Sequence, residues 1–234
     1  MPQFRQNSGG CGLEDKALQQ LVFFDLDGTV SRHDTLWQWL SAFLWRHPWR
    51  WPRLLGVLPC LVQFLLGRAD HGVLKARLLQ SALGGIDRAT VGAHTTRWLA
   101  GFIPRGCYAD ALSAIRAHQH QGDILILMSA SVDAYVPELA RTLGFAECIC
   151  TPTGWRTDGS YDGRLTGPNC REQEKVVRFR ARLALQPGAR TWAYGNSAPD
   201  LPHLRLADRG ILVNGPSRVR ALATRAGIEC VDWR

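Results

Sequence analysis

Residues 21–30 read LVFFDLDGTV, so four apolar residues run directly into two carboxylates, Asp25 and Asp27. A short apolar run of this kind is typical of a strand that is buried on both faces, as in a parallel sheet. Gly28 marks the point where the backbone turns sharply at the end of the strand. The two carboxylates are therefore expected at the C-terminal edge of the sheet, where open α/β folds bind their ligands.

Two carboxylates this close repel each other unless a proton or a cation offsets their charge, and a divalent metal ion is the commonest solution. The alternative is a strand followed by an acidic turn without chemistry. Three signals downstream favour chemistry. Residues 125–129 form an apolar run that ends in the hydroxyl of Ser129, Lys175 begins a predicted helix, and residues 195–200, GNSAPD, follow a third apolar run.

The chain around these signals alternates predicted strands and helices, which is the pattern of a doubly wound, Rossmann-like parallel sheet. Strands are expected at residues 21–24, 124–128, 146–150, 191–194, 211–213 and 228–231, and helices at residues 110–119, 132–143, 172–185, 200–207 and 217–226. We expect residues 211–213 to form an edge strand. Residues 152–168, rich in Gly, Thr and Asp, are expected to form a loop or a small hairpin.

Residues 32–107 differ from the rest because they hold six of the nine tryptophans and carry no strand signal. Helices are expected at residues 34–46, 70–83 and 87–100. Between the first two, residues 53–68 are apolar on nearly every face, and Pro59 interrupts them. We interpret the whole stretch as a helical cap.

The 234 residues can hold one α/β core with a modest second module. We predict that residues 19–31 and 108–234 form the core and that residues 32–107 are inserted into it as the cap. Residues 1–18 are polar and contain several glycines. They are predicted to be a disordered N-terminal tail.

The composition limits which partners the protein could bind and where in the cell it is expected. A net charge of +8 favours anionic partners such as phosphate esters or acidic lipid, and the scattered arginines give no nucleic-acid-binding motif, so no nucleic acid is expected. Seven cysteines without a C-x-x-C pair, and no apolar leader in residues 1–16, predict a reduced, cytoplasmic protein. If residues 53–68 contact lipid, we expect peripheral attachment to the inner face of the cell membrane.

The order of these signals, an acidic strand end, a hydroxyl, a lysine and an acidic turn, resembles the four motifs of the haloacid-dehalogenase-like (HAD) phosphatases. The resemblance covers residues 20–231. A helical cap between the first and second motifs is similar to the phosphoserine-phosphatase-like subfamily. Within it, the apolar cap segment flanked by tryptophan and arginine resembles the phosphatidylglycerophosphatase C branch, which acts on phosphatidylglycerophosphate.

The resemblance assigns a role to each motif. Asp25 would attack phosphorus to form an aspartyl-phosphate, and Asp27 would protonate the leaving group and then activate water. Ser129 and the backbone N–H of Ala130 would bind the phosphoryl oxygens, and Lys175 would offset their charge. Taken singly, the serine would be read sooner as a helix cap and the lysine as a solvated charge, and only their combination favours the phosphate-binding roles.

The resemblance also implies Mg²⁺, held by Asp25, the backbone carbonyl of Asp27, Asn196 and Asp200. Members of the family usually carry Asp where this chain has Asn196. An amide oxygen can ligate magnesium but brings no charge, so metal affinity is expected to be lower and Asp200 to carry more of the electrostatic load.

Three functions fit the sequence: a magnesium-dependent phosphatase of a lipid headgroup, a soluble phosphatase of a small metabolite such as phosphoserine, and a catalytically weak phosphate- or lipid-binding module. In the second, the apolar cap segment would be the middle of a helical bundle. Candidates for headgroup contacts are Asp34, His71, Lys75 and Arg77, each of which also reads as an ordinary polar residue of a helix.

Overall fold

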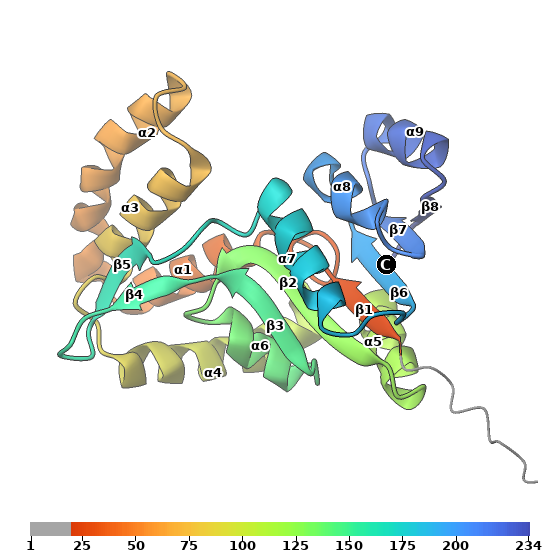
Figure 1. The fold of residues 1–234 in the computed structure, drawn as a ribbon. Coiled ribbons are helices and arrows are strands. Elements are labelled where there is room, and N and C mark those ends of the chain that lie inside the picture. Colours follow the sequence, from red (N-terminus) through yellow and green to blue (C-terminus); the bar gives the residue numbers. More distant parts are fainter. Residues whose placement is uncertain (1–19) are drawn as a thin grey trace, which may run out of the picture.

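The computed structural model describes residues 20–234, and the predicted tail lies outside the described residues. A six-stranded, all-parallel sheet in the order β3-β2-β1-β6-β7-β8 forms its centre (Figure 1). The strands are β1 (Leu21–Phe24), β2 (Ile124–Val132), β3 (Glu147–Thr151), β6 (Thr191–Gly195), β7 (Arg209–Val213) and β8 (Glu229–Val231). The predicted α/β fold is therefore confirmed.

β1 lies inside the sheet and is buried on both faces, as its apolar run predicts. Val22 and Phe24 belong to one hydrophobic cluster, whereas Leu21 and Phe23 belong to another. All four side chains have an exposed fraction of 0%. The two carboxylates that follow are thus carried by one of the best-buried segments of the fold.

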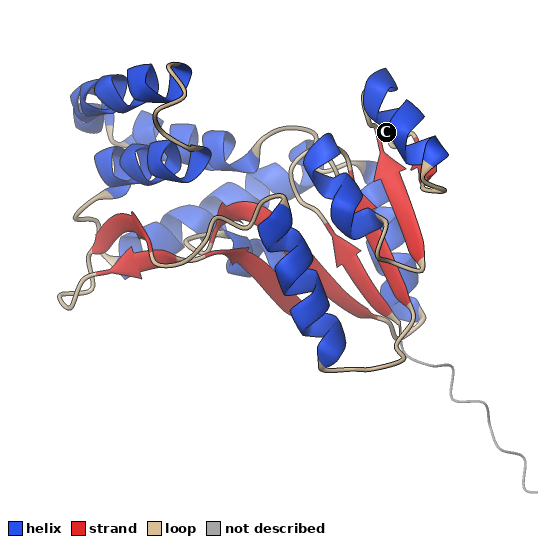
Figure 2. Ribbon diagram, turned by 45° about the horizontal axis from the view of Figure 1, so that its top comes forward, coloured by secondary structure: helices blue, strands red, loops and turns tan. Residues whose placement is uncertain are grey.

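Helices cover both faces of this sheet (Figure 2). One face is covered by α5 (Ala109–His120) and α6 (Val136–Thr142), and the other by α7 (Gln173–Ala184), α8 (Leu201–Leu204), which follows the short helix η2 (Ala198–Asp200), and α9 (Ser217–Arg225). Two sequence predictions are wrong in detail. The helix expected from residue 132 begins only at Val136, because β2 continues through Val132. The strand expected at an edge, β7, is internal because β8 pairs with it.

The stretch predicted as a cap is helical in the structure. It contains α1 (Thr35–Arg46), η1 (Pro48–Val57), α2 (Leu58–Leu65), α3 (His71–Leu83) and α4 (Arg88–Gly106), and no strand lies within residues 32–107. Asp34, Asp70 and Asp87 each cap the helix that follows by accepting a backbone N–H. α4 runs six residues past its predicted end, since Phe102 still packs into the core.

A hairpin of β4 (Thr153–Trp155) and β5 (Tyr161–Leu165) joins these helices, within the segment expected to be a loop or small hairpin. The backbone N–H of Tyr161 donates to Ile86 O at 2.7 Å, and that of Gly85 donates to Tyr161 O at 3.0 Å. Gly163 has a φ of +79°, and a Cβ there would lie 2.5 Å from the Cα of Gln80 on α3. The hairpin therefore rests directly on α3.

The helices of residues 32–107 share one hydrophobic cluster with the sheet. Trp39 of α1 stacks on Tyr135 with ring centroids 4.8 Å apart, and its Nε1 donates to Thr95 Oγ1 of α4 at 3.0 Å. Both Trp39 and Tyr135 are fully buried. α1 and α4 are consequently fixed on the α/β core by packing.

α2 contrasts with these helices because none of its residues is buried. Leu58, Leu61 and Leu65 have exposed fractions of 52%, 37% and 74%. No helix within residues 20–234 is long and apolar enough to cross a membrane. The apolar segment singled out in the sequence therefore lies on the surface, at the outer end of the helical stretch (Figure 1).

We predict that Gly163→Ala destabilises the protein by about 1 kcal/mol more than Gly159→Ala, measured by urea unfolding. Both glycines have a φ near +80°, so both alanines carry the left-handed cost of about 1–2 kcal/mol. Only the Cβ at residue 163 would meet α3, since nothing lies within 4 Å of the one at residue 159. Equal losses would show that the hairpin is not packed on α3.

Candidate active site

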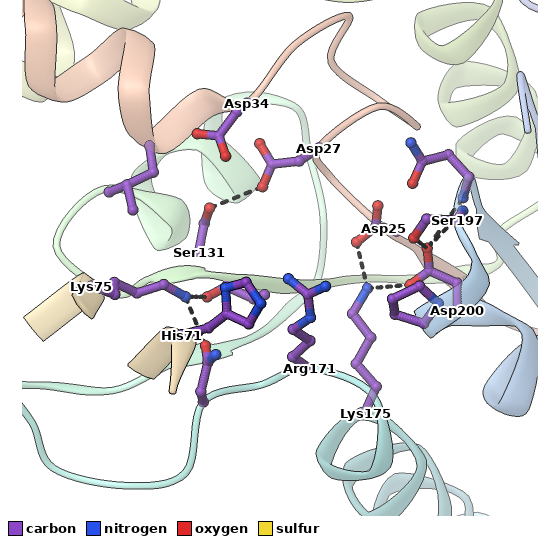
Figure 3. A pocket seen from close by; sticks show the side chains of 15 residues that line it. Asp25, Asp27, Asp34, His71, Lys75, Ser131, Arg171, Lys175, Ser197 and Asp200 are labelled. Carbon is purple, nitrogen blue, oxygen red and sulfur yellow. Dashed lines mark hydrogen bonds and ion pairs between the residues drawn. The ribbon is translucent and has the colours of Figure 1, made fainter. Parts of the chain in front are cut away.

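The C-terminal ends of β1, β2 and β6 open into a pocket of about 410 Å³ (Figure 3). Its lining combines charged and polar side chains from the sheet edge and from the predicted cap. The main lining residues are Asp25, Asp27, Asp34, His71, Lys75, Ala130, Ser131, Asn169, Arg171, Lys175, Asn196, Ser197 and Asp200. Every predicted catalytic and metal-binding residue is among them.

Lys175 lies between two carboxylates at the floor of this pocket. Its Nζ is 2.5 Å from Asp25 Oδ1 and 2.7 Å from Asp200 Oδ1. Asp25 follows β1, Asp200 ends the turn after the adjacent strand β6, and Lys175 lies in the first turn of α7. The exposed fractions are 6%, 2% and 4% for Asp25, Asp200 and Lys175. The ion pairs are therefore shielded from solvent and depend on all three elements.

The pKa values of the two carboxylates are shifted in opposite directions. Burial raises the pKa of Asp25 to about 7, although Lys175 opposes the shift. Burial acts in the same way on Asp200, but Lys175 and the hydrogen bonds to its carboxylate lower its pKa to about 2. The charges of Asp200 and Asp27 raise the pKa of Asp25 further. Asp200 Oδ2 instead accepts from Ser197 Oγ at 2.6 Å and from two backbone N–H groups, which favour its ionised form.

Asp27 is held by a separate set of donors. Its Oδ1 accepts from the backbone N and the Oγ1 of Thr35, both at 2.6 Å, and its Oδ2 accepts from Ser131 Oγ at 2.9 Å. Burial, and secondly Asp34, raise the pKa of Asp27 despite these hydrogen bonds. Sequence reasoning missed Thr35 and Ser131 as positioning residues. Their signal was weak: a hydroxyl at the start of a predicted helix and another two residues after Ser129.

Asn196 packs against the turn that carries the carboxylates. Gly28 has a φ of +83°, and a Cβ there would lie 1.9 Å from Asn196 Nδ2. Within residues 20–234, no three side chains of His, Cys, Asp or Glu converge as a metal-binding group. A metal ion here would thus need amide or backbone oxygens among its ligands, and both Asn196 and Asp27 line the pocket.

The predicted phosphate-binding residues lie at different depths. Ser129 has an exposed fraction of 0%, and its Oγ accepts from the backbone N–H of Ser131 at 3.0 Å. Ala130 lines the pocket, but Ser129 does not. The phosphate role of Ser129 stays a prediction, while the hydroxyl that lines the pocket next to Ala130 is that of Ser131.

Lys75 connects α3 to the sheet edge. Its Nζ donates to Ala130 O at 2.6 Å and to Asn169 Oδ1 at 2.7 Å, and burial lowers its pKa to about 8. Asn169 and Arg171 lie in a loop where no sequence motif pointed to them. Of the four predicted headgroup contacts, only Arg77 lies outside this pocket.

The sequence is similar to a known protein family and to bacterial proteins. Residues 22–205 match the family described as haloacid dehalogenase-like hydrolase. The chain is 34% identical over 191 residues to protein CicA of Caulobacter vibrioides, covering 80% of this chain and 83% of that protein. It is 26% identical over 223 residues to a Mycobacterium tuberculosis protein named phosphoserine phosphatase, covering 93% and 72%.

Among solved structures, a protein of unknown function from Bordetella pertussis Tohama I matches this chain with a TM-score of 0.78. The two are 25% identical, and the match covers 92% of this chain and 98% of that chain. The similarity therefore extends beyond the sheet to the helices inserted after β1.

We predict that Lys175→Met lowers the free energy of unfolding by about 3–5 kcal/mol at pH 7, because it leaves the buried Asp200 carboxylate without its cation. The pKa of Asp200 is about 2, below its unfolded value of 3.8. Its stabilisation is therefore present above about pH 4 and is lost as the pH falls toward 2.

The deficit of the variant should accordingly shrink between about pH 4 and pH 2, measured by urea unfolding in the presence of EDTA. Lys16→Met, a substitution in the N-terminal stretch, controls for the loss of a lysine. A deficit that is independent of pH would contradict the assigned ion pairs.

Proposed function

Because this chain belongs to the haloacid dehalogenase-like hydrolase family, we propose that it is a magnesium-dependent phosphomonoesterase that works through an aspartyl-phosphate intermediate. One observation carries the proposal: Asp25 and Asp27 line a single pocket together with Lys175. Phosphoryl transfer needs a nucleophile, an acid for the leaving group and positive charge near the phosphoryl oxygens. The three residues can supply these in that order.

In the first step, an Asp25 carboxylate oxygen attacks phosphorus, and the bond to the ester oxygen breaks as Asp27 donates its proton to that oxygen. In the second step, Asp27 takes a proton from water, which attacks the same phosphorus and releases phosphate and the free Asp25 carboxylate. A raised pKa suits Asp27 for the first role. Hydrogen bonds from Thr35 and Ser131 keep its carboxyl aimed into the pocket.

The residues present fit a magnesium ion. Asp25 and Asp200 share the single charge of Lys175, and Asp27 adds a third carboxyl group, so a divalent cation would offset the negative charge that remains when these groups ionise. The available donors, from Asp25, the Asp27 carbonyl, Asn196 and Asp200, are all oxygen atoms, which Mg²⁺ prefers. When bound, the ion would favour the ionised form of Asp25 and offset charge on the phosphoryl group.

For the substrate, we propose a phospholipid headgroup such as that of phosphatidylglycerophosphate, reached from the membrane surface. α2 is strongly apolar, yet none of its residues is buried. The neighbouring Trp45 and Trp49 have exposed fractions of 75% and 69%. Residues 35–69 include four arginines and no acidic residue, which suits an anionic lipid surface.

A second candidate is a small soluble phosphate ester such as phosphoserine, favoured by the similarity to the protein named phosphoserine phosphatase. A third, a catalytically weak binding module, is favoured by the uncharged Asn196 at a proposed ligand position. Hydrolysis of p-nitrophenyl phosphate with and without magnesium separates the two phosphatases from the binding module, and flotation with anionic liposomes separates the first phosphatase from the second.

We predict that Asp25→Asn abolishes hydrolysis of p-nitrophenyl phosphate, because the amide cannot attack phosphorus. Asp27→Asn should slow turnover by roughly 10²–10⁴-fold, the range for a lost general acid or base. Steady-state kinetics with magnesium measure both, and circular dichroism checks the fold. Activity of Asp25→Asn within tenfold of wild type would rule out the nucleophile assignment.

We predict that replacing Leu58, Leu61 and Leu65 with Ser weakens binding to anionic liposomes at least about a hundredfold, since one fully buried leucine contributes about 1.5–3 kcal/mol. Hydrolysis of p-nitrophenyl phosphate should survive, because none of the three side chains is buried in the fold.

The matched control replaces Leu185, Leu206 and Leu222, which are exposed leucines on the α/β core. If the control weakens flotation equally, or if the first variant unfolds, α2 is not the lipid-binding surface.

A further inference from the structure

A second pocket lies on the helical stretch, away from the proposed active site. Its volume is about 500 Å³, and it shares no lining residue with the pocket that holds Asp25. It lies between η1, the second half of α3 and the β4–β5 hairpin, and its lining is Arg53, Gly56, Arg77, Gln80, Ser81, Gly84, Gly85 and Arg156. Three guanidinium groups therefore converge on one concave surface, without a carboxylate in the lining.

Neutral acceptors hold two of these arginines in place. Arg77 Nε donates to Gly56 O at 3.1 Å, and Arg53 Nη1 donates to Gly84 O at 3.3 Å. Within residues 20–234, neither Arg53 nor Arg77 forms an ion pair. Their positions are fixed by backbone carbonyls, while their charges are not neutralised.

Two further arginines, Arg156 in the lining and Arg50 next to Arg53, add positive charge to this region. Arg156 is 3.7 Å from Asp162, a loose ion pair. Arg50, with an exposed fraction of 9%, donates to Ala82 O at 2.9 Å. Burial, and secondly the charge of Arg53, lower the pKa of Arg50. Arg50 and Arg53 thus repel each other, and an anion in the pocket would relieve that repulsion.

Ser81 adds a hydroxyl donor to the lining of this pocket. It lines the pocket with an exposed fraction of only 8%. Its hydroxyl has no hydrogen-bond partner within residues 20–234. A hydroxyl with no protein partner is free to donate to an oxyanion in the pocket.

We propose that Arg53, Arg77, Arg156 and Ser81, here called the cap anion site, bind the phosphate group of an anionic phospholipid that is not the substrate. Planar guanidinium groups suit phosphate oxygens, which accept two N–H donors at once. The lipid assignment rests on the membrane contact proposed above.

Position supports a lipid as the source of the phosphate. Arg53 lies in the same short helix as Leu55, which has an exposed fraction of 67%, and Trp51 lies two residues before it. The surrounding residues 35–69 contain no acidic side chain that could repel a headgroup. A lipid held here would orient the helices with α2 toward the bilayer and leave the active-site pocket free.

The test is the double variant Arg53→Gln/Arg77→Gln, assayed by co-sedimentation with vesicles of phosphatidylcholine alone or mixed with phosphatidylglycerol. Binding to the mixed vesicles should fall about thirtyfold, about fivefold for each arginine lost near the surface. The control Arg218→Gln/Arg225→Gln removes the same charge from the exposed surface of α9. If both double variants lose vesicle binding equally, the loss reflects net charge alone, and the proposed cap anion site is wrong.

If the double variant does not fold, Arg156→Gln and Arg164→Gln form a second matched pair. Both arginines are 3.7 Å from Asp162, but only Arg156 lines the cap anion site. Only Arg156→Gln should weaken binding, by about fivefold. Equal effects would again overturn the proposal.

Two further arms separate the possible outcomes. Inorganic phosphate is titrated into wild type and the double variant while tryptophan fluorescence is followed. A signal that the double variant loses, with vesicle binding unchanged, would identify free phosphate as the occupant and overturn the lipid assignment. Hydrolysis of p-nitrophenyl phosphate reports the proposed function separately and should be unchanged in the double variant, because neither arginine lines the active-site pocket.

Discussion

The contact of one lysine with two buried carboxylates is the constraint on which the proposed active site depends. Lys175 Nζ is within 2.7 Å of both Asp25 and Asp200, which follow adjacent strands β1 and β6. Charges this deeply buried are tolerated only when they are paired and hydrogen-bonded. The pairing therefore fixes the first turn of α7 against the sheet edge, and these are the side chains proposed to act on a phosphate ester.

The inserted helices present two different surfaces. Trp39 and Tyr135 seal one of them onto the core through a shared hydrophobic cluster, and Lys75 reaches from it to the carbonyl of Ala130. The second surface, formed by η1 and α2, carries exposed leucine and tryptophan beside Arg53, which forms no ion pair within residues 20–234. One packed surface and one unburied surface on a single insertion are what the proposed lipid contact requires.

The sequence by itself determined the parallel sheet and indicated most residues of the proposed site. The apolar run of residues 21–24 was long enough for a strand but too short for a helix, so two-sided burial and a carboxylate-bearing edge followed. The same reasoning located Lys175, Asn196 and Asp200, because each lies where a strand ends or a helix begins. The strand propensity of the residues could not predict where β2 ends or that β7 lies inside the sheet. Both depend on pairing with another strand, β3 for the end of β2 and β8 for β7.

Only the tertiary structure decided which side chains contact one another. Thr35 and Ser131 are 96 residues apart in the chain, yet both donate to Asp27, and Asn169 and Arg171 enter the pocket from a loop without a motif. The apolar pattern of residues 53–68 was compatible with a bundle core and with a lipid-facing surface. Only the tertiary packing showed that no residue of α2 is buried. Hydrophobic side chains favour burial, but the sequence does not show whether another part of the fold packs against them.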